Sequence, residues 1–137
     1  MARIFTKGTP FIIVSTTREG NSHDENLDNF EQAVAHLKAF NVPFHTGIGS
    51  WRGQAESVVV LKDSDDGRCS AHLIAAFCRQ QCILYVDGQD NASFGDVKHG
   101  YLPSERVIGR FTNTPEWEAE RASEYTAVGR HYYVVKT

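Results

Sequence analysis

The chain has 137 residues, of which 41% are hydrophobic and 23% charged, which is the size and composition of one ordinary globular domain. A net charge of −3 argues against nucleic acid as a partner, because such binding depends on neutralising phosphates, and it is too small for a protein that imitates DNA. We expect no membrane partner, because no run of about 18 apolar residues occurs and residues 1–7 lack the apolar stretch of a signal peptide. An odd number of cysteines in such a chain predicts free thiols, at Cys69, Cys78 and Cys82.

The first half of the sequence alternates between strand and helix patterns. A continuous β-branched and aromatic run predicts a buried strand over residues 11–15. Ser22 and Glu25 form a capping box that starts one helix, and Ser64 is expected to cap a second. Further strands are expected within residues 43–51 and over residues 56–62 and 82–86, with a turn at residues 51–54. The second helix is expected to turn four side chains toward the core, namely Leu73, Ala76, Phe77 and Cys78.

This order of elements, within about residues 8–87, predicts a ferredoxin-like α+β fold with a βαββαβ core, one antiparallel sheet and both helices on one face. The strands carry apolar residues at consecutive positions, so both faces of the sheet need burial, and we expect copies of the chain to assemble through the sheet. Residues 88–137 are expected to form a C-terminal extension of the same single domain, 1–137. Within it we expect strands over residues 107–111 and 132–135 and a helix that starts at Thr114.

Candidate site residues lie close to the first and third strands. The loop after the first strand offers hydroxyls and backbone N–H groups beyond a strand end, where ligands often bind in α/β sheets, at Ser15, Thr16, Thr17 and Arg18. Glu56 begins an otherwise apolar strand, so it is either a solvent-facing edge residue or a placed functional charge. Trp51 and His45 lie in the same region, where a rim residue and a surface histidine are the simpler interpretations.

Familiar catalytic patterns are missing from the sequence. It contains no phosphate-binding loop, no dinucleotide fingerprint, no nucleophile elbow and no paired CxxC motif. The six histidines are scattered without metal-ligand spacing, so we expect no metal and no cofactor.

Several short motifs, taken in order, resemble those of the phage enzymes that degrade S-adenosylmethionine, an antirestriction family first called hydrolases and now regarded as lyases. The resemblance extends from Ile4 to Val135, and no single motif carries it alone. The motifs are Ile4-Phe5-Thr6-Lys7, Phe11-Ile12-Ile13-Val14-Ser15 with Thr17-Arg18, Trp51-x-Gly53-x-x-Glu56-x-Val58, Ala75-x-x-Cys78 before Cys82-Ile83-Leu84-Tyr85, Gly109-x-Phe111 and Arg130-x-Tyr132-x-Val134.

The resemblance implies a ferredoxin-like core assembled as a PII-like homotrimer with active sites between subunits. It implies cleavage of S-adenosylmethionine to methylthioadenosine and L-homoserine lactone in the cytoplasm of an infected bacterial host. It assigns the functional glutamate to Glu56. In this family a tyrosine also contributes to the active site. The nearest region of this sequence has Phe44 and His45 instead, so the residue that makes this second catalytic contact is not identified.

The implied chemistry suits a site with few catalytic side chains. The substrate carries its own nucleophile, a carboxylate that is already ionised at pH 7, and its leaving group departs as a neutral thioether, so no general base or acid is needed. Holding the substrate in the reactive conformer contributes on the order of 7–11 kcal/mol in well-oriented intramolecular reactions. We expect Glu56 to bind the cationic end of the substrate and backbone groups of residues 15–18 to hold the adenosine.

Two alternatives stay open at this point. A PII-like sensor on the same fold would bind adenine nucleotides unchanged, although the short turn around Gly53 lacks the long loop of such sensors. A hydrolase in which Glu56 activates water would give homoserine instead of the lactone.

Overall fold

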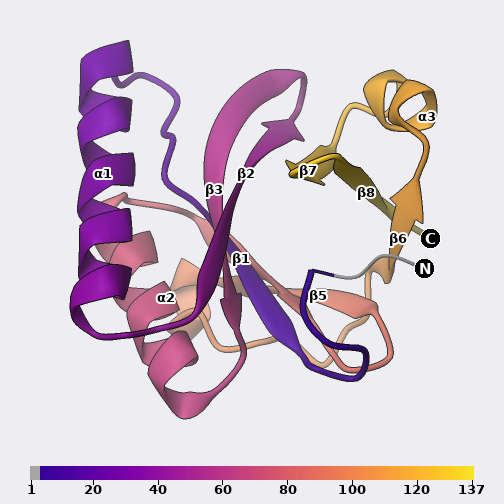
Figure 1. The fold of residues 1–137 in the computed structure, drawn as a ribbon, viewed down its shortest axis with the longest axis horizontal. Coiled ribbons are helices and arrows are strands. Elements are labelled where there is room, and N and C mark those ends of the chain that lie inside the picture. Colours follow the sequence, from indigo (N-terminus) through magenta and orange to yellow (C-terminus); the bar gives the residue numbers. More distant parts are fainter. Residues whose placement is uncertain (1–3) are drawn as a thin grey trace.

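The computed structural model describes residues 4–137, so the first three residues of the N-terminal segment discussed above lie outside the described residues. Within residues 4–137, eight strands close into one antiparallel barrel in the order β1-β3-β2-β7-β8-β6-β5-β4 (Figure 1). The strands are β1 (Phe11–Ser15), β2 (Phe44–Trp51), β3 (Gln54–Lys62), β4 (Cys82–Val86), β5 (Asn91–Asp96), β6 (Gly109–Thr114), β7 (Tyr125–Val128) and β8 (His131–Lys136). The helices are α1 (His23–Ala39), α2 (Asp65–Phe77), α3 (Glu116–Arg121) and the 3-10 turn η1 (Val97–His99).

The predicted ferredoxin-like fold is wrong, because the sheet does not stop at four strands. It continues from β2 into β7 and from β4 into β5, and β6 and β8 complete the ring. Residues 88–137 therefore supply four of the eight strands described for residues 4–137. Among residues 4–137 the ring of strands leaves no open sheet edge.

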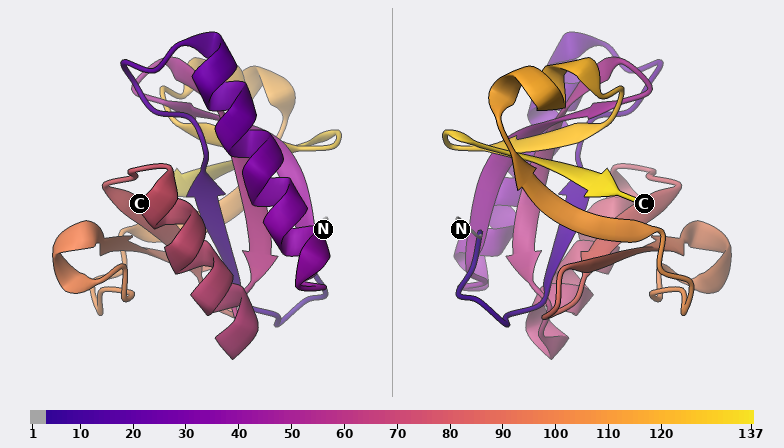
Figure 2. Two further views of the ribbon diagram at one scale, coloured as in Figure 1. Left: turned by 90° about the vertical axis from the view of Figure 1, so that its left-hand side faces the viewer. Right: turned by 90° about the vertical axis from the view of Figure 1, so that its right-hand side faces the viewer.

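The two faces of the sheet enclose separate cores, because successive residues of a strand point to opposite sides. Helices α1 and α2 lie side by side against the outer face of β1, β3 and β4, while α3 lies on the far side of the barrel (Figure 2). Under the helices, the outer core is built from residues such as Ile12, Val14, Leu37, Leu61 and Ile74. Inside the barrel, the second core contains Phe11, Ile13, Val58, Val60, Val86, Phe111 and Tyr133.

Both long helices begin where the sequence predicts. Ser22 and Glu25 form the expected capping box, and the Ser64 side chain accepts a hydrogen bond from the Gly67 N–H. The predicted inner face of α2 is partly wrong, since Leu73 and Ala76 are exposed and the helix instead buries residues that include Ala71, Ile74 and Ala75. None of the described helices is both long and apolar enough to cross a membrane.

Candidate functional site

A pocket of about 1140 Å³ opens at one end of the barrel interior. Strand alternation explains which side chains reach it. Ser15 follows Ile13 on the inner face of β1, and Glu56 precedes Val58 on the inner face of β3. The inner face therefore changes from apolar to polar at the last residue of β1 and near the start of β3, and these polar side chains line the pocket.

Glu56 is the one charged side chain on the described lining of this pocket that is withdrawn from solvent. It is half-buried, whereas the arginines and other glutamates on the lining are exposed, namely Arg18, Arg52, Arg79, Glu19 and Glu124. Burial raises the pKa of the Glu56 carboxyl, and a hydrogen bond from Ser15 opposes part of that rise. The Ser15 hydroxyl donates to Glu56 Oε2 over 2.9 Å. A buried carboxylate with one oxygen committed to a serine can offer its other oxygen to a bound cation.

A glycine on the neighbouring strand makes room for this carboxylate. Gly49 of β2 pairs with Glu56, and a Cβ at Gly49 would lie 3.3 Å from both the Cγ and the Oε1 of Glu56. Any side chain at this position would therefore press on the Glu56 carboxyl. The pairing of glutamate with glycine keeps this part of the pocket open.

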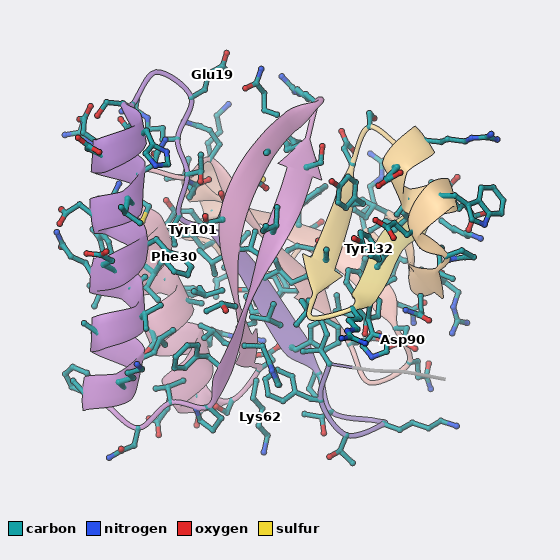
Figure 3. The ribbon with its side chains drawn as sticks, turned by 45° about the horizontal axis from the view of Figure 1, so that its top comes forward. Glu19, Phe30, Lys62, Asp90, Tyr101 and Tyr132 are labelled. Atoms are coloured by element: carbon teal, nitrogen blue, oxygen red, sulfur yellow. The ribbon has the colours of Figure 1, made fainter. Side chains whose placement is uncertain are left out.

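The loop that follows β1 is tied to the pocket wall from two sides. The Ser57 N–H donates to Thr17 Oγ1 over 2.9 Å, and Gln80 Nε2 donates to the Thr17 carbonyl over 2.8 Å. The Arg18 N–H donates to Asn26 Oδ1 at the start of α1. These bonds hold the loop in one conformation beside Glu56. In Figure 3 the labelled Glu19 of this loop lies at the same end of the molecule as the β2–β3 hairpin.

Aromatic rings form the other walls of the pocket. Trp51 ends β2 at a two-residue turn in which Arg52 and Gly53 have positive φ, the geometry that suits a tight hairpin. Its ring meets Phe94 of β5, with centroids 5.8 Å apart and planes at 83°. Deeper in the barrel, Phe111 stacks on Tyr133 at 4.9 Å, and Tyr125 of β7 also lines the pocket.

The structure brings together most, but not all, of the residues that the sequence singles out. Ser15, Thr17, Arg18, Trp51 and Glu56 all line the pocket. Which of them contact a substrate stays a prediction.

Two of the singled-out residues do not line the pocket. Thr16 is fully buried and donates to the Ser57 carbonyl, so it joins β1 to β3. His45 is exposed, packs its ring on Phe5, and lies six residues from Trp51 along β2, which is about 20 Å in a strand.

Several lining residues escaped sequence reasoning. Gln80 and Cys82 come from the α2–β4 junction, and Phe94, Tyr125 and Tyr133 come from the second half of the chain. Cys82 and Leu84 line the pocket on alternate positions of β4, so period-two alternation was the available signal for Cys82. For the other residues the signal was missing, because their place at the pocket depends on closure of the barrel.

Comparison with known proteins assigns the chain to a family. The sequence model of the S-Adenosylmethionine lyase family matches residues 12–136, which is nearly the whole chain. No curated protein matches the chain.

Proposed function

Because the chain belongs to the S-adenosylmethionine lyase family, we propose that it converts S-adenosylmethionine to methylthioadenosine and L-homoserine lactone. The family establishes a lyase that acts on S-adenosylmethionine, and the proposal concerns the products and the path to them. The observation that carries it is the half-buried Glu56 carboxylate on a pocket lining whose other described charged side chains are exposed.

In the proposed reaction the substrate supplies every reacting atom. An oxygen of its carboxylate attacks the γ-carbon, the bond between that carbon and sulfur breaks, and the bonding electrons leave on sulfur as a neutral thioether. No proton is gained or lost. The negative charge of the nucleophile and the positive charge of the sulfonium cancel along this path, so a pocket that excludes water favours the transition state.

Glu56 is proposed to bind the cationic end of the substrate. An opposite charge next to a carboxylate favours its ionised form, so the ammonium or sulfonium offsets the burial that raises the pKa of Glu56. Ser15 fixes one carboxylate oxygen, Oε2, and the other oxygen, Oε1, lies beside Gly49. The clamped loop of residues 15–18 is proposed to hold the ribose side of the adenosine.

The test is to follow the products from the earliest times by proton NMR after purified protein is mixed with S-adenosylmethionine. Methylthioadenosine together with homoserine lactone, before any homoserine, is the expected result of internal attack. Homoserine that appears without prior lactone contradicts the proposal and points to water as the nucleophile.

The role of Glu56 is tested by Glu56→Gln, which keeps the shape of the side chain and removes its charge. Turnover at substrate concentrations below KM is expected to fall by roughly 10- to 100-fold, because the loss of a charge-assisted contact to the bound cation costs about 1.5–3 kcal/mol. Glu31→Gln, at an exposed position of α1 outside the pocket, is the matched control. Near-normal turnover by Glu56→Gln rules out this role.

A hydrolase is the second candidate, because the raised pKa of Glu56 also suits a general base that activates water. The NMR time course separates it from the lyase. The sensor alternative loses its basis, because it rested on a ferredoxin-like fold that the closed barrel replaces.

We also propose a homotrimer with pockets completed between subunits, as the resemblance implies. What supports it is the volume of the pocket, about 1140 Å³, which exceeds the roughly 300–1,000 Å³ of typical ligand sites. The pocket also has exposed rim residues that a second copy can cover. Sedimentation combined with assays at decreasing protein concentration tests this idea. A fully active monomer is incompatible with it.

The proposed biological role is removal of S-adenosylmethionine in the cytoplasm of a bacterium infected by a phage. Restriction and methylation enzymes that need this molecule then stop working. Expression of the chain in a strain whose restriction depends on S-adenosylmethionine is expected to raise the plating efficiency of unmodified phage, whereas Glu56→Gln is not.

A further inference from the structure

Trp51 and Phe94 meet across the mouth of the barrel. They belong to β2 and β5, which are not neighbours in the sheet, so their contact is not a consequence of strand pairing. Each ring comes from a different half of the chain, and both line the pocket. The contact joins two walls of the pocket that strand pairing does not connect directly.

The distance from this aromatic contact to Glu56 follows from strand geometry. Glu56 pairs with Gly49, and Trp51 lies two residues further along β2 on the same side of the sheet. Two residues of a strand span about 7 Å. The Trp51 side chain therefore starts one pleat outward from the Glu56 side chain on the same face of the sheet, and both side chains line the pocket.

We propose that Trp51 and Phe94 bind the adenine ring of the substrate at the barrel mouth while its cationic end lies at Glu56. This inference rests on the proposed function and assigns the orientation of the substrate. S-adenosylmethionine has a flat base at one end, positive charges at the other and a ribose between them. An indole or phenyl ring binds a base by stacking, which contributes roughly 5- to 150-fold in affinity per base. Because the planes of Trp51 and Phe94 meet at 83°, one ring stacks on the base and the other meets its edge.

The surroundings of Trp51 allow a base to enter. The Arg52 guanidinium lies over the Trp51 ring at 5.8 Å, and this arginine is exposed at the tip of the hairpin. Such a side chain can move aside for a flat ligand. The opposite orientation, with the sulfonium against the indole, also satisfies an aromatic ring through a cation–π contact, so the test must separate base from charge.

Tryptophan fluorescence makes that separation, because the chain has only two tryptophans. Trp117 lies on α3, is 61% exposed and does not line the pocket, so Trp117→Phe leaves Trp51 as the single reporter. Methylthioadenosine, which has the base but no positive charge, is expected to quench this fluorescence in a saturable way. Methionine, which lacks the base, is expected to leave it unchanged.

Substitutions of Trp51 and Phe94 test whether these two rings bind the adenine base. Phe94→Leu in the single-tryptophan protein is expected to weaken methylthioadenosine binding by roughly 5-fold or more. Trp51→Leu is expected to raise the KM for S-adenosylmethionine by a similar factor with little change in kcat, because a base contact made equally before and during reaction affects binding alone. Trp51→Phe, which keeps an aromatic ring, is expected to restore most of the affinity. Phe40→Leu, at an exposed aromatic residue on the C-terminal cap of α1, is the control.

The outcomes distinguish this inference from the proposed function. If the protein cleaves S-adenosylmethionine but Trp51→Leu and Phe94→Leu leave KM and methylthioadenosine affinity unchanged, the adenine site is overturned and the lyase stands. If methylthioadenosine binds, as measured by calorimetry, without changing Trp51 fluorescence, the adenine site is also overturned. If the protein neither cleaves S-adenosylmethionine nor binds methylthioadenosine, both proposals fall together.

Discussion

Glu56 shows how one side chain can work against the stability of the fold that holds it. Its carboxyl lies between the apolar interior of the barrel and the pocket, where it accepts a hydrogen bond from the Ser15 hydroxyl. Burial raises its pKa because the charged form loses water. Residues with this conflict are common in functional sites, where a charge is kept for a ligand.

Glu56→Gln is therefore expected to stabilise the protein at neutral pH while it removes activity. Between the pKa of the unfolded chain and the raised pKa of the folded state, the folded protein holds more protons, so its stability falls as pH rises through that window. Each unit of raised pKa corresponds to about 1.4 kcal/mol of lost stability above the window. Thermal unfolding of wild type and variant from pH 4 to pH 8 measures the difference between their free energies of unfolding. The advantage of the variant should grow with pH. Glu31→Gln should show no such trend, and a Glu56→Gln variant that is less stable at pH 8 contradicts the argument.

The three free thiols differ in reactivity for a related reason. Burial raises the pKa of Cys78 to about 12, and burial together with the nearby Glu56 and Asp96 carboxylates raises the pKa of Cys82. Cys69 is exposed on α2. Because the thiolate is the reactive form, one thiol should react rapidly with a disulfide reagent at pH 8 and the other two slowly. Cys69→Ser should abolish the fast phase, and a remaining fast thiol contradicts this assignment.

At the scale of elements, Gly67 explains how closely α2 packs against the strand that precedes it. A Cβ built on this residue would lie 2.0 Å from the Lys62 carbonyl oxygen, which belongs to the end of β3. Gly67 is also the residue whose N–H is capped by Ser64. The glycine lets the chain turn from strand to helix with almost no connecting residues.

Gly67→Ala is therefore expected to destabilise the protein by about 1–3 kcal/mol, as overpacking does. Helix propensity alone predicts the opposite sign, since alanine is about 1 kcal/mol better than glycine in a helix interior. Ala76→Gly, at an exposed position of the same helix, is the matched control and should lose no more than that propensity difference. Urea unfolding of both variants measures the two effects, and a stabilised Gly67→Ala variant refutes the packing argument.

At the scale of the whole molecule, the interior core needs both halves of the chain. Phe11 and Val60 come from the first half, and Phe111 and Tyr133 from the second. Phe111 is 6% exposed and packs its ring against Phe11 at 5.4 Å. The barrel interior is thus a single core that both halves of the chain build.

A chain that ends at residue 87 is therefore expected not to form a stable, compact domain. Without β5 to β8, the inner face of β1, β3 and β4 faces water, and exposed apolar surface of this kind leads to aggregation. Dye binding, circular dichroism and sedimentation of the fragment test this expectation. A monomeric fragment with a cooperative unfolding transition contradicts it. In the intact chain, Phe111→Ala should cost about 3–5 kcal/mol, and the exposed Trp117→Ala far less.

The sequence predicts local features well because local chemistry determines them. The strand over residues 11–15 and the Ser22 and Ser64 caps follow from apolar runs and hydroxyl spacing. The same reasoning places Glu56 and Trp51 near one another, since a tight turn joins their strands.

Closure of the barrel was not predictable in this way. Strand β5 contains Gly95, whose missing side chain lets the Tyr101 carbonyl approach to within 2.4 Å of where a Cβ would lie, and such a polar segment resembles a loop. Strand β7 has only four residues, and its four side chains are all half-buried. These segments are strands because of the partners they meet. The position of Phe94 at the pocket depends on those partners, so it was invisible until the ring of strands was known.

The order of strands around the ring also has a kinetic meaning. The last strand described, β8, lies between β6 and β7, and β7 in turn joins β2 in the first half of the sequence. Pairings between such distant segments slow folding. The ring closes only when β8 is available to join β6 to β7, so during synthesis the residues up to Lys136 must leave the ribosome before the pocket has all its walls.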